Sequence, residues 1–124
     1  MTRENWKGDA PVADLRPLDQ LEQTIAARAA QPSGESYTAQ LLAGGVEKIG
    51  SKVVEEAAEV VEAAGESGDA GREHLVREAA DLMYHILVLL RCRDTSLADV
   101  EAELARRFGV SGLEERASRK KQGE

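Results

Sequence analysis

Hydrophobic residues recur at helical spacing along most of the chain, and the first such repeat begins directly after Pro17. Residues 31–36 (QPSGES) interrupt this repeat with a run of turn-forming residues. The pattern therefore predicts a first helix between Pro17 and that turn. The members of the repeat lie three or four residues apart and are Leu18, Leu21, Ile25 and Ala29.

A short second helix is predicted over residues 37–43 (YTAQLLA). Ser36 or Thr38 can cap its start, because a side-chain oxygen at this position accepts a hydrogen bond from the free backbone amides of the first turn. Gly44 and Gly45 then close the segment, as glycine commonly does at the end of a helix.

Two longer helices follow, separated by a predicted loop at residues 65–71 (GESGDAG). The first covers about residues 46–64. The second, about residues 72–91, carries apolar residues around almost its whole circumference, which is typical of a helix that is buried on every side. Such a helix needs neighbours all around it, and the chain offers few other long helices. A second copy of the chain is therefore expected to complete the bundle as a homodimer.

A last amphipathic helix is predicted after Arg93, with Thr95 or Ser96 as its cap and Gly109 as its end. Residues 111–124 have only a marginal helical pattern, and we expect them to fray. The apolar repeat of this last helix is Leu97, Val100, Leu104 and Phe108.

Composition supports a single all-α domain. The chain has 124 residues, of which 42% are hydrophobic and 31% are charged, which suffices for one core. Aromatic residues make up only 3%, so strands are poorly represented and helices are favoured. Residues 1–16 lack a clear period and are expected to form a flexible extension, which leaves residues 17–124 as the domain. We predict a small antiparallel helical bundle.

Charge and apolar content exclude several classes of function. The net charge of −7 argues against a nucleic-acid binder, which needs a basic face, and a phosphorylated substrate would have to arrive with a cation. Cys92 is the only cysteine, so neither a disulfide nor a thiolate metal site is expected. The longest apolar run, residues 86–90, is far too short to span a membrane, and residues 1–11 lack the apolar core of a signal peptide. A cytoplasmic protein is expected.

Residues 52–64 (KVVEEAAEVVEAA) place acids unusually close to an apolar helix face. With about 100° of rotation per residue, Glu55 and Glu62 point nearly opposite the centre of the apolar arc. Glu56 lies at the edge of the arc, and Glu59 lies between Glu56 and Glu55. The arc consists of Val53, Val54, Ala57, Val60, Val61 and Ala64.

The next helix carries one narrow polar strip within its apolar circumference, formed by His74, Glu78, Asp81 and His85. Carboxylates are rarely buried without a partner, because desolvating the charge is costly. A salt bridge to a lysine or arginine of another helix would supply that partner. If Glu56 and Glu59 instead form the opposite wall, four carboxylates converge and repel one another. A divalent cation with oxygen ligands, such as Mg²⁺, would then neutralise them.

These acids match a known pattern. E-E-x-x-E at Glu55, Glu56 and Glu59, followed by E-x-x-D at Glu78 and Asp81, resembles the signature of the all-α nucleoside triphosphate pyrophosphohydrolases, the MazG-like superfamily. More narrowly, SYTAQLL, EAADLMYHILVLL and SLADVEAELARR are similar to the phosphoribosyl-ATP pyrophosphohydrolase family of histidine biosynthesis, over about residues 18–107.

One residue departs from that family's pattern. Val54 stands where the family usually has glycine, directly before the acidic pair. Because Val54 lies on the apolar arc, we expect altered packing and not a lost ligand.

The resemblance implies an all-helical subunit that dimerises, a dependence on Mg²⁺, and hydrolysis of phosphoribosyl-ATP to phosphoribosyl-AMP and pyrophosphate. Under this hypothesis the metal ligands are Glu56, Glu59, Glu78 and Asp81. Glu55 joins Glu56 and Glu59 as a catalytic residue if it acts as a base beside the metal; the alternative is a plain surface acid.

Substrate contacts are expected from Lys48, Lys52 and His85. The two lysines lie on the flank that also carries Glu56, so a helix salt bridge from Lys52 to Glu56 is an equally good explanation of their spacing. His85 could instead be a core histidine, or it could hydrogen-bond a ligating carboxylate. Two other functions stay open: hydrolysis of other nucleoside triphosphates, and a non-catalytic helical interaction module.

Overall fold

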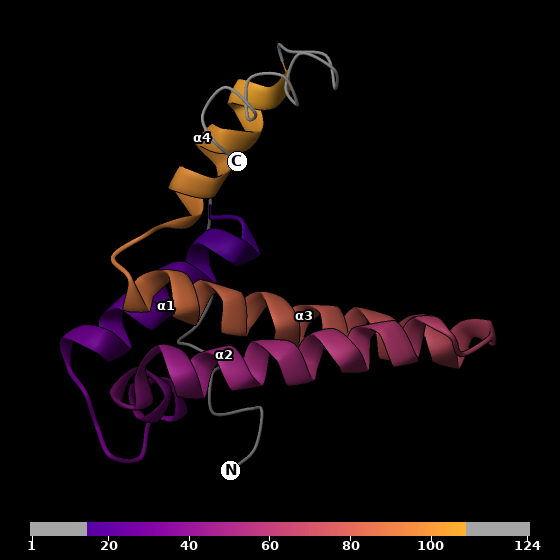
Figure 1. Cartoon of the computed structure of the whole chain (residues 1–124), viewed down its shortest axis with the longest axis horizontal. Coiled ribbons are helices and arrows are strands. Elements are labelled where there is room, and N and C mark those ends of the chain that lie inside the picture. The colour runs from indigo at the N-terminus through magenta and orange to yellow at the C-terminus, as the bar shows by residue number, and fades with distance from the viewer. Residues whose placement is uncertain (1–14, 109–124) are drawn as a thin grey trace.

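The structure, a computed structural model, describes residues 15–108 and consists there of four helices (Figure 1). They are α1 (Pro17–Ala30), α2 (Tyr37–Ala64), α3 (Gly68–Cys92) and α4 (Leu97–Phe108). α2 and α3 lie side by side as a long antiparallel hairpin, α1 packs at the open end of this hairpin, and α4 projects away from it (Figure 1). The predicted all-α fold is confirmed.

Most of the residues 1–16 predicted as an extension lie outside the described part of the chain. The predicted helix end at Gly109 and the tail of residues 111–124 lie outside it as well.

α2 spans both the short helix and the long helix that the sequence predicts before residue 65. Its backbone leaves the helical conformation at Gly45, where φ is 71° and ψ is −169°, so the predicted break appears as a kink inside one element. Glycine adopts a positive φ without a steric penalty, which explains why the kink falls there. At the start of α2, Ser36 is the cap: its Oγ accepts a hydrogen bond of 3.1 Å from the backbone amide of Ala39.

α3 begins at Gly68 and not near Arg72, so the predicted loop of residues 65–71 is too long. Asp69 lies in the first turn, where a negative charge interacts favourably with the helix dipole. Gly71 is helical and buried. A Cβ atom at Gly71 would lie 2.6 Å from the backbone oxygen of Glu66, so this glycine permits the close approach of the α2–α3 turn. The sequence alone does not separate that role from a loop glycine.

The apolar core lies at the open end of the hairpin, where α1 meets α2 and α3. Its fully packed members are Ile25, Leu41, Ile49, Tyr84, Leu87 and Val88. α3 is only partly buried within the single chain, because Val76, Met83 and Ile86 are exposed. The described structure therefore covers one side of α3 and leaves another side open.

α4 is tied to the rest of the molecule through residues of its first half. Ser96 caps it through a reciprocal pair: Ser96 Oγ accepts from the Asp99 amide, and Asp99 Oδ2 accepts from the Ser96 amide. Glu22 Oε2 accepts a hydrogen bond of 2.7 Å from the Leu97 amide, which ties α4 to α1. None of the residues of α4 is buried.

Candidate metal centre

The buried line of α2 runs through Ile49, Glu56 and Ala63, which are seven residues apart. Glu56, with 3% of its surface exposed, therefore lies in the middle of the face that packs on α3. The helical wheel places Glu56 at the edge of the apolar arc, so the centre of the buried face differs from the centre of that arc. The wheel takes the most apolar arc as the buried one, whereas Val54 and Val61 of that arc are 71% and 74% exposed.

α3 presents its polar strip to the same seam. Glu78, Asp81 and His85 are all buried, and His74 is half-buried. The strip predicted from the sequence thus faces α2 as expected, and it meets Glu56 across the seam between the two helices.

Three carboxylates converge in this seam. One ligand oxygen from each of Glu56, Glu59 and Glu78 lies within 4.8 Å of the other two. At such a separation two unit negative charges repel by about 3 kcal/mol at an effective dielectric constant of about 20. Oxygen ligands from a few carboxylates are the set that Mg²⁺ uses in proteins, so the donor set fits this ion.

Asp81 is buried one helical turn beyond Glu78 but is not part of the cluster of three. The structure therefore brings together three of the four residues that the sequence predicts as ligands. Within residues 15–108, Oε2 of Glu56 and Oε2 of Glu78 are buried and accept no hydrogen bond, although both residues take part in other interactions.

His74 is a cationic candidate for pairing with Glu78. Its Nε2 lies 3.3 Å from Glu78 Oε1, and its Nδ1 lies 3.0 Å from Glu66 Oε2. The hydrogen bond that His74 donates to Glu66 raises the pKa of His74, and the charge of Glu78 adds to this effect. The salt-bridge alternative thus has one partner for Glu78 in His74, which comes from the same helix.

Lys52 forms an ion pair with Glu55, one turn away on α2. Its Nζ lies 3.2 Å from Glu55 Oε2, and the Glu55 side chain is more than half exposed. Burial lowers the pKa of Lys52, but the hydrogen bond to Glu55 and the charges around it outweigh this, so the pKa is raised overall. Lys48 is exposed, and its side chain lies over Gly44, where a Cβ would collide with it.

His85 has protein partners on both ring nitrogens. Nδ1 lies 2.7 Å from the backbone oxygen of Asp81, which can only accept, so Nδ1 carries the proton. Nε2 then accepts a hydrogen bond of 2.8 Å from the Tyr37 hydroxyl. Burial lowers the pKa of His85, which favours this neutral ring. Of the roles considered for His85, the structure fits the core histidine: the side chain is buried, and its bond to Asp81 goes to the backbone oxygen of that residue.

Tyr37 is the residue that sequence reasoning misses. Its hydroxyl reaches His85 from the first turn of α2, across 48 positions of sequence. Neither spacing nor residue type reveals such a pairing, because both partners are ordinary members of an amphipathic pattern.

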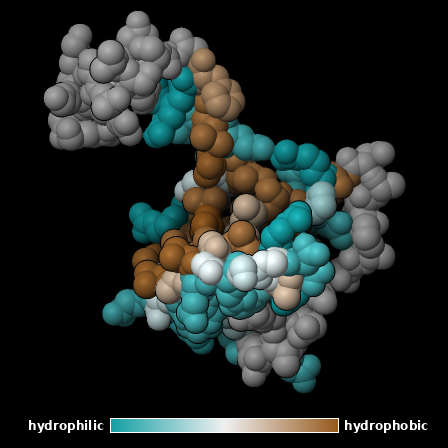
Figure 2. Space-filling view, turned by 90° about the vertical axis from the view of Figure 1, so that its right-hand side faces the viewer, coloured by the Kyte–Doolittle hydropathy of each residue, from teal (hydrophilic) through white to brown (hydrophobic). Residues whose placement is uncertain are grey.

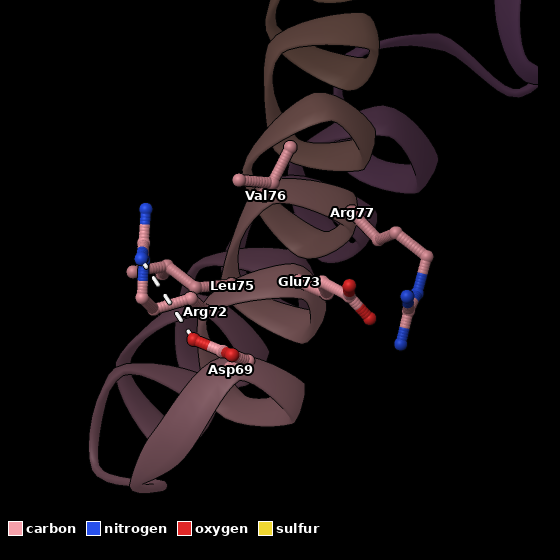
Figure 3. Close-up of a pocket in the computed structure, with 6 residues that line it drawn as sticks. All are labelled: Asp69, Arg72, Glu73, Leu75, Val76 and Arg77. Carbon is pink, nitrogen blue, oxygen red and sulfur yellow. Dashed lines mark ion pairs between the residues drawn. The ribbon is translucent and has the colours of Figure 1, made fainter.

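One hollow on the described surface is lined by residues other than the clustered acids. It is an open groove of about 610 Å³ along the first turns of α3, lined by Asp69, Arg72, Glu73, Leu75, Val76 and Arg77 (Figure 3). In Figure 3 Arg72 turns toward Asp69, at 3.9 Å, while Arg77 points to another side of the helix. All its lining residues come from one helix, so we do not assign the chemistry to this groove.

Within the described residues, no helix is both long and apolar enough to cross a membrane.

Comparison with known proteins shows the family of the chain. The family model described as phosphoribosyl-ATP pyrophosphohydrolase matches residues 18–108. A protein of Rhodopirellula baltica named phosphoribosyl-ATP pyrophosphatase is 53% identical over 105 residues, covering 85% of this chain and 88% of its own length. Proteins of the same name from Paracoccus denitrificans and Parvibaculum lavamentivorans are 52% and 53% identical, and the matches cover 93% and 95% of their lengths. They cover 83% and 86% of this chain.

Proposed function

Because the chain belongs to the phosphoribosyl-ATP pyrophosphohydrolase family, we propose that the carboxylates in the α2–α3 seam form its metal centre, with Mg²⁺ as the ion. The activity is the hydrolysis of phosphoribosyl-ATP to phosphoribosyl-AMP and pyrophosphate in histidine biosynthesis. The observation that carries the proposed centre is the convergence of Glu56, Glu59 and Glu78 within 4.8 Å. Asp81, buried one turn further along α3, is the fourth ligand of the proposal.

The three clustered acids differ in how deeply they are buried. Glu56 and Glu78 are fixed in the seam between two packed helices, whereas Glu59 is half-buried and forms the solvent side of the cluster. When bound, the ion would neutralise phosphate oxygens and make a water nucleophilic. Glu55 directly precedes Glu56 and is exposed on the flank of α2 that also carries Glu59. We propose that Glu55 accepts the proton of the attacking water at the edge of the site.

We assign the phosphates of the substrate to the flank of α2 that carries Lys48 and Lys52. Both lysines lie on the side of α2 where Glu55 and Glu59 point to solvent, so a polyphosphate bound at the acids would pass them. Lys52 is held by Glu55 in the described structure and would exchange that partner for a phosphate oxygen. His85 is bonded to protein on both ring nitrogens, so we assign it no direct contact with the substrate.

A second copy of the chain would cover the apolar face of the hairpin. It would cover apolar side chains that are exposed on both helices: Val54, Val61, Val76, Met83 and Ile86. Figure 2 shows that apolar residues occupy a sizeable part of one side of the molecule. Exposed apolar surface marks an interaction site, and a two-fold axis lets one patch cover its own copy. We therefore propose a homodimer, and a cytoplasmic location in keeping with a biosynthetic enzyme.

The reaction itself is tested by product analysis with phosphoribosyl-ATP and Mg²⁺. We expect intact pyrophosphate, because the site offers a metal-activated water and none of its acids is needed as a nucleophile for stepwise phosphate removal. Direct release of orthophosphate, with pyrophosphatase contamination excluded, would contradict the proposal. The same assay with dUTP and dCTP in place of phosphoribosyl-ATP tests the substrate, and turnover of these nucleotides should be much slower.

A further inference from the structure

Two tyrosines lie together at the open end of the seam, and each hydroxyl forms a hydrogen bond between α2 and α3. The rings of Tyr37 and Tyr84 are stacked with centroids 6.0 Å apart. The Tyr84 hydroxyl bonds Thr38 Oγ1 at 2.6 Å and is buried in the core. The Tyr37 hydroxyl bonds His85 Nε2 at 2.8 Å, and His85 in turn bonds the backbone oxygen of Asp81. The Tyr37 hydroxyl is thus linked, through His85, to the backbone of an acid of the seam.

Tyr37 also lies within electrostatic reach of that site. Burial raises the pKa of Tyr37, Lys52 lowers it, and the charges of Glu56, Glu55 and Asp81 raise it further. The Tyr37 side chain starts before the kink at Gly45, whereas Glu56 follows that kink on α2. Tyr37 therefore belongs to the first segment of α2 and lies near two other parts of the site. These are the acid-bearing segment of α2 and the turn of α3 that carries Asp81.

We propose that Tyr37 is a positioning residue of the metal centre: through His85 it holds the Asp81 turn of α3 in register against α2. A slide or rotation of α3 would move Asp81 relative to Glu56 and Glu59, and the chain of two hydrogen bonds opposes both movements. This inference rests on the proposed function, because it takes Asp81 as a ligand. Outer partners that orient ligands typically contribute about 10–100-fold to metal affinity or activity.

The two tyrosines provide a matched pair of variants. Tyr37→Phe and Tyr84→Phe each remove one hydroxyl and keep the stacked rings. In a calorimetric titration with Mg²⁺ alone, Tyr37→Phe should weaken binding about tenfold or more, whereas Tyr84→Phe should leave it unchanged. In the phosphoribosyl-ATP assay, Tyr37→Phe should raise the Mg²⁺ concentration for half-maximal rate by a similar factor while kcat at saturating Mg²⁺ changes little.

A double-variant cycle checks that the link runs through His85. His85→Asn keeps a donor for the Asp81 carbonyl but removes the acceptor for Tyr37. If both residues act in one chain, the double variant should bind Mg²⁺ no more weakly than either single variant. Additive losses, or equal shifts in Tyr37→Phe and Tyr84→Phe, would overturn the positioning role. Thermal melts identify any variant that is merely unfolded.

Asp81→Asn separates failure of this inference from failure of the metal centre. If Asp81→Asn weakens Mg²⁺ binding and Tyr37→Phe does not, the metal centre stands and the positioning role is refuted. If neither change affects Mg²⁺ binding, the assignment of Asp81 as a ligand is refuted, and the positioning role fails with it.

Discussion

The two halves of the α2–α3 seam bury side chains of opposite character. Toward the open end, the seam is filled by apolar side chains such as Ile49 and Val88, both fully buried. Toward the tip, the line is continued by Glu56 and Glu78, which are almost as deeply buried. Burial of the apolar half stabilises the fold. Burial of the acidic half destabilises it, because the carboxylates lose hydration and repel one another.

The positions of Ile49 and Glu56 make this difference sharp. Both lie on one line of α2, one heptad apart, and both face α3. A fold that needed only stability would place an apolar residue at both positions. We infer that the packed half holds the two helices rigidly enough to keep the acids together when no cation is bound.

The largest effect is expected from Glu56→Gln, which breaks the acidic half. Loss of a ligand should cost at least as much as loss of a residue that orients ligands, for which about 10–100-fold is typical. We therefore expect turnover of phosphoribosyl-ATP to fall by about 100-fold or more. Stability of the metal-free protein should hold or rise, because one of the repelling charges is removed. The check is a kinetic assay at saturating Mg²⁺ together with a metal-free thermal melt.

The same substitution type at the fourth proposed ligand distinguishes metal binding from a structural salt bridge. Asp81→Asn should also leave metal-free stability unchanged or higher while activity falls by orders of magnitude. If Asp81 instead pairs with a buried cation, the change should cost about 3–5 kcal/mol of stability. A strongly destabilised variant with near-normal turnover would refute its role at the metal.

Ile49→Ala is the matched change in the apolar half. Truncating a fully buried isoleucine should reduce the free energy of unfolding by about 2–5 kcal/mol, through lost transfer energy and the cavity left behind. Turnover per folded molecule should stay near that of the unaltered chain. Denaturant unfolding and activity at low temperature measure the two quantities, and a large loss of turnover in the folded variant would remove the contrast between the halves.

Val61→Glu tests whether the apolar face outside the seam is covered by a second copy. Val61 is exposed in the single chain, so the change should cost the monomer little, but a charge within the proposed interface should dissociate the dimer. Light scattering gives the expected monomer mass. Glu62→Arg, on the charged side of α2, is the control and should stay dimeric. A monomeric unaltered chain would exclude the proposed homodimer.

The smallest effect is expected from the Lys52–Glu55 ion pair at the edge of the acids. Such exposed pairs contribute about 1 kcal/mol at most. Because the folded-state pKa of Lys52 is raised above 10.5, this contribution is complete below that pH and is lost as the pH rises through the raised value. Comparing the stability of Lys52→Met with the unaltered chain across this alkaline range measures it. A difference that grows with pH would contradict the sign.

Periodicity and capping residues are sufficient to predict most of the fold. Ser36 and Ser96 cap the helices that follow them, and Gly45 marks the predicted break, because these features depend on residues only a few positions away. The start of α3 was less predictable: Gly71 looks like a loop residue until its contact with the Glu66 backbone is known.

The acidic site was predictable in its members but not in its geometry. The E-E-x-x-E and E-x-x-D spacings identify the acids, yet the wheel could not place Glu56 in the seam, because the exposed Val54 and Val61 dominate the apolar arc. The most apolar face of a helix is not its buried face in a single chain if that apolar face packs against a second molecule. The bond between Tyr37 and His85 depends on how α2 and α3 are packed, and no local pattern encodes it.

The most direct test of the account is a calorimetric titration of the unaltered chain, Glu56→Gln and Ile49→Ala with Mg²⁺, without substrate and at a temperature where all three are folded. The account predicts saturable binding by the unaltered chain and by Ile49→Ala, and loss of that binding in Glu56→Gln. Equal Mg²⁺ affinity in Glu56→Gln and the unaltered chain, or no saturable binding by the unaltered chain, would contradict the claim that the acidic half of the seam is a metal centre.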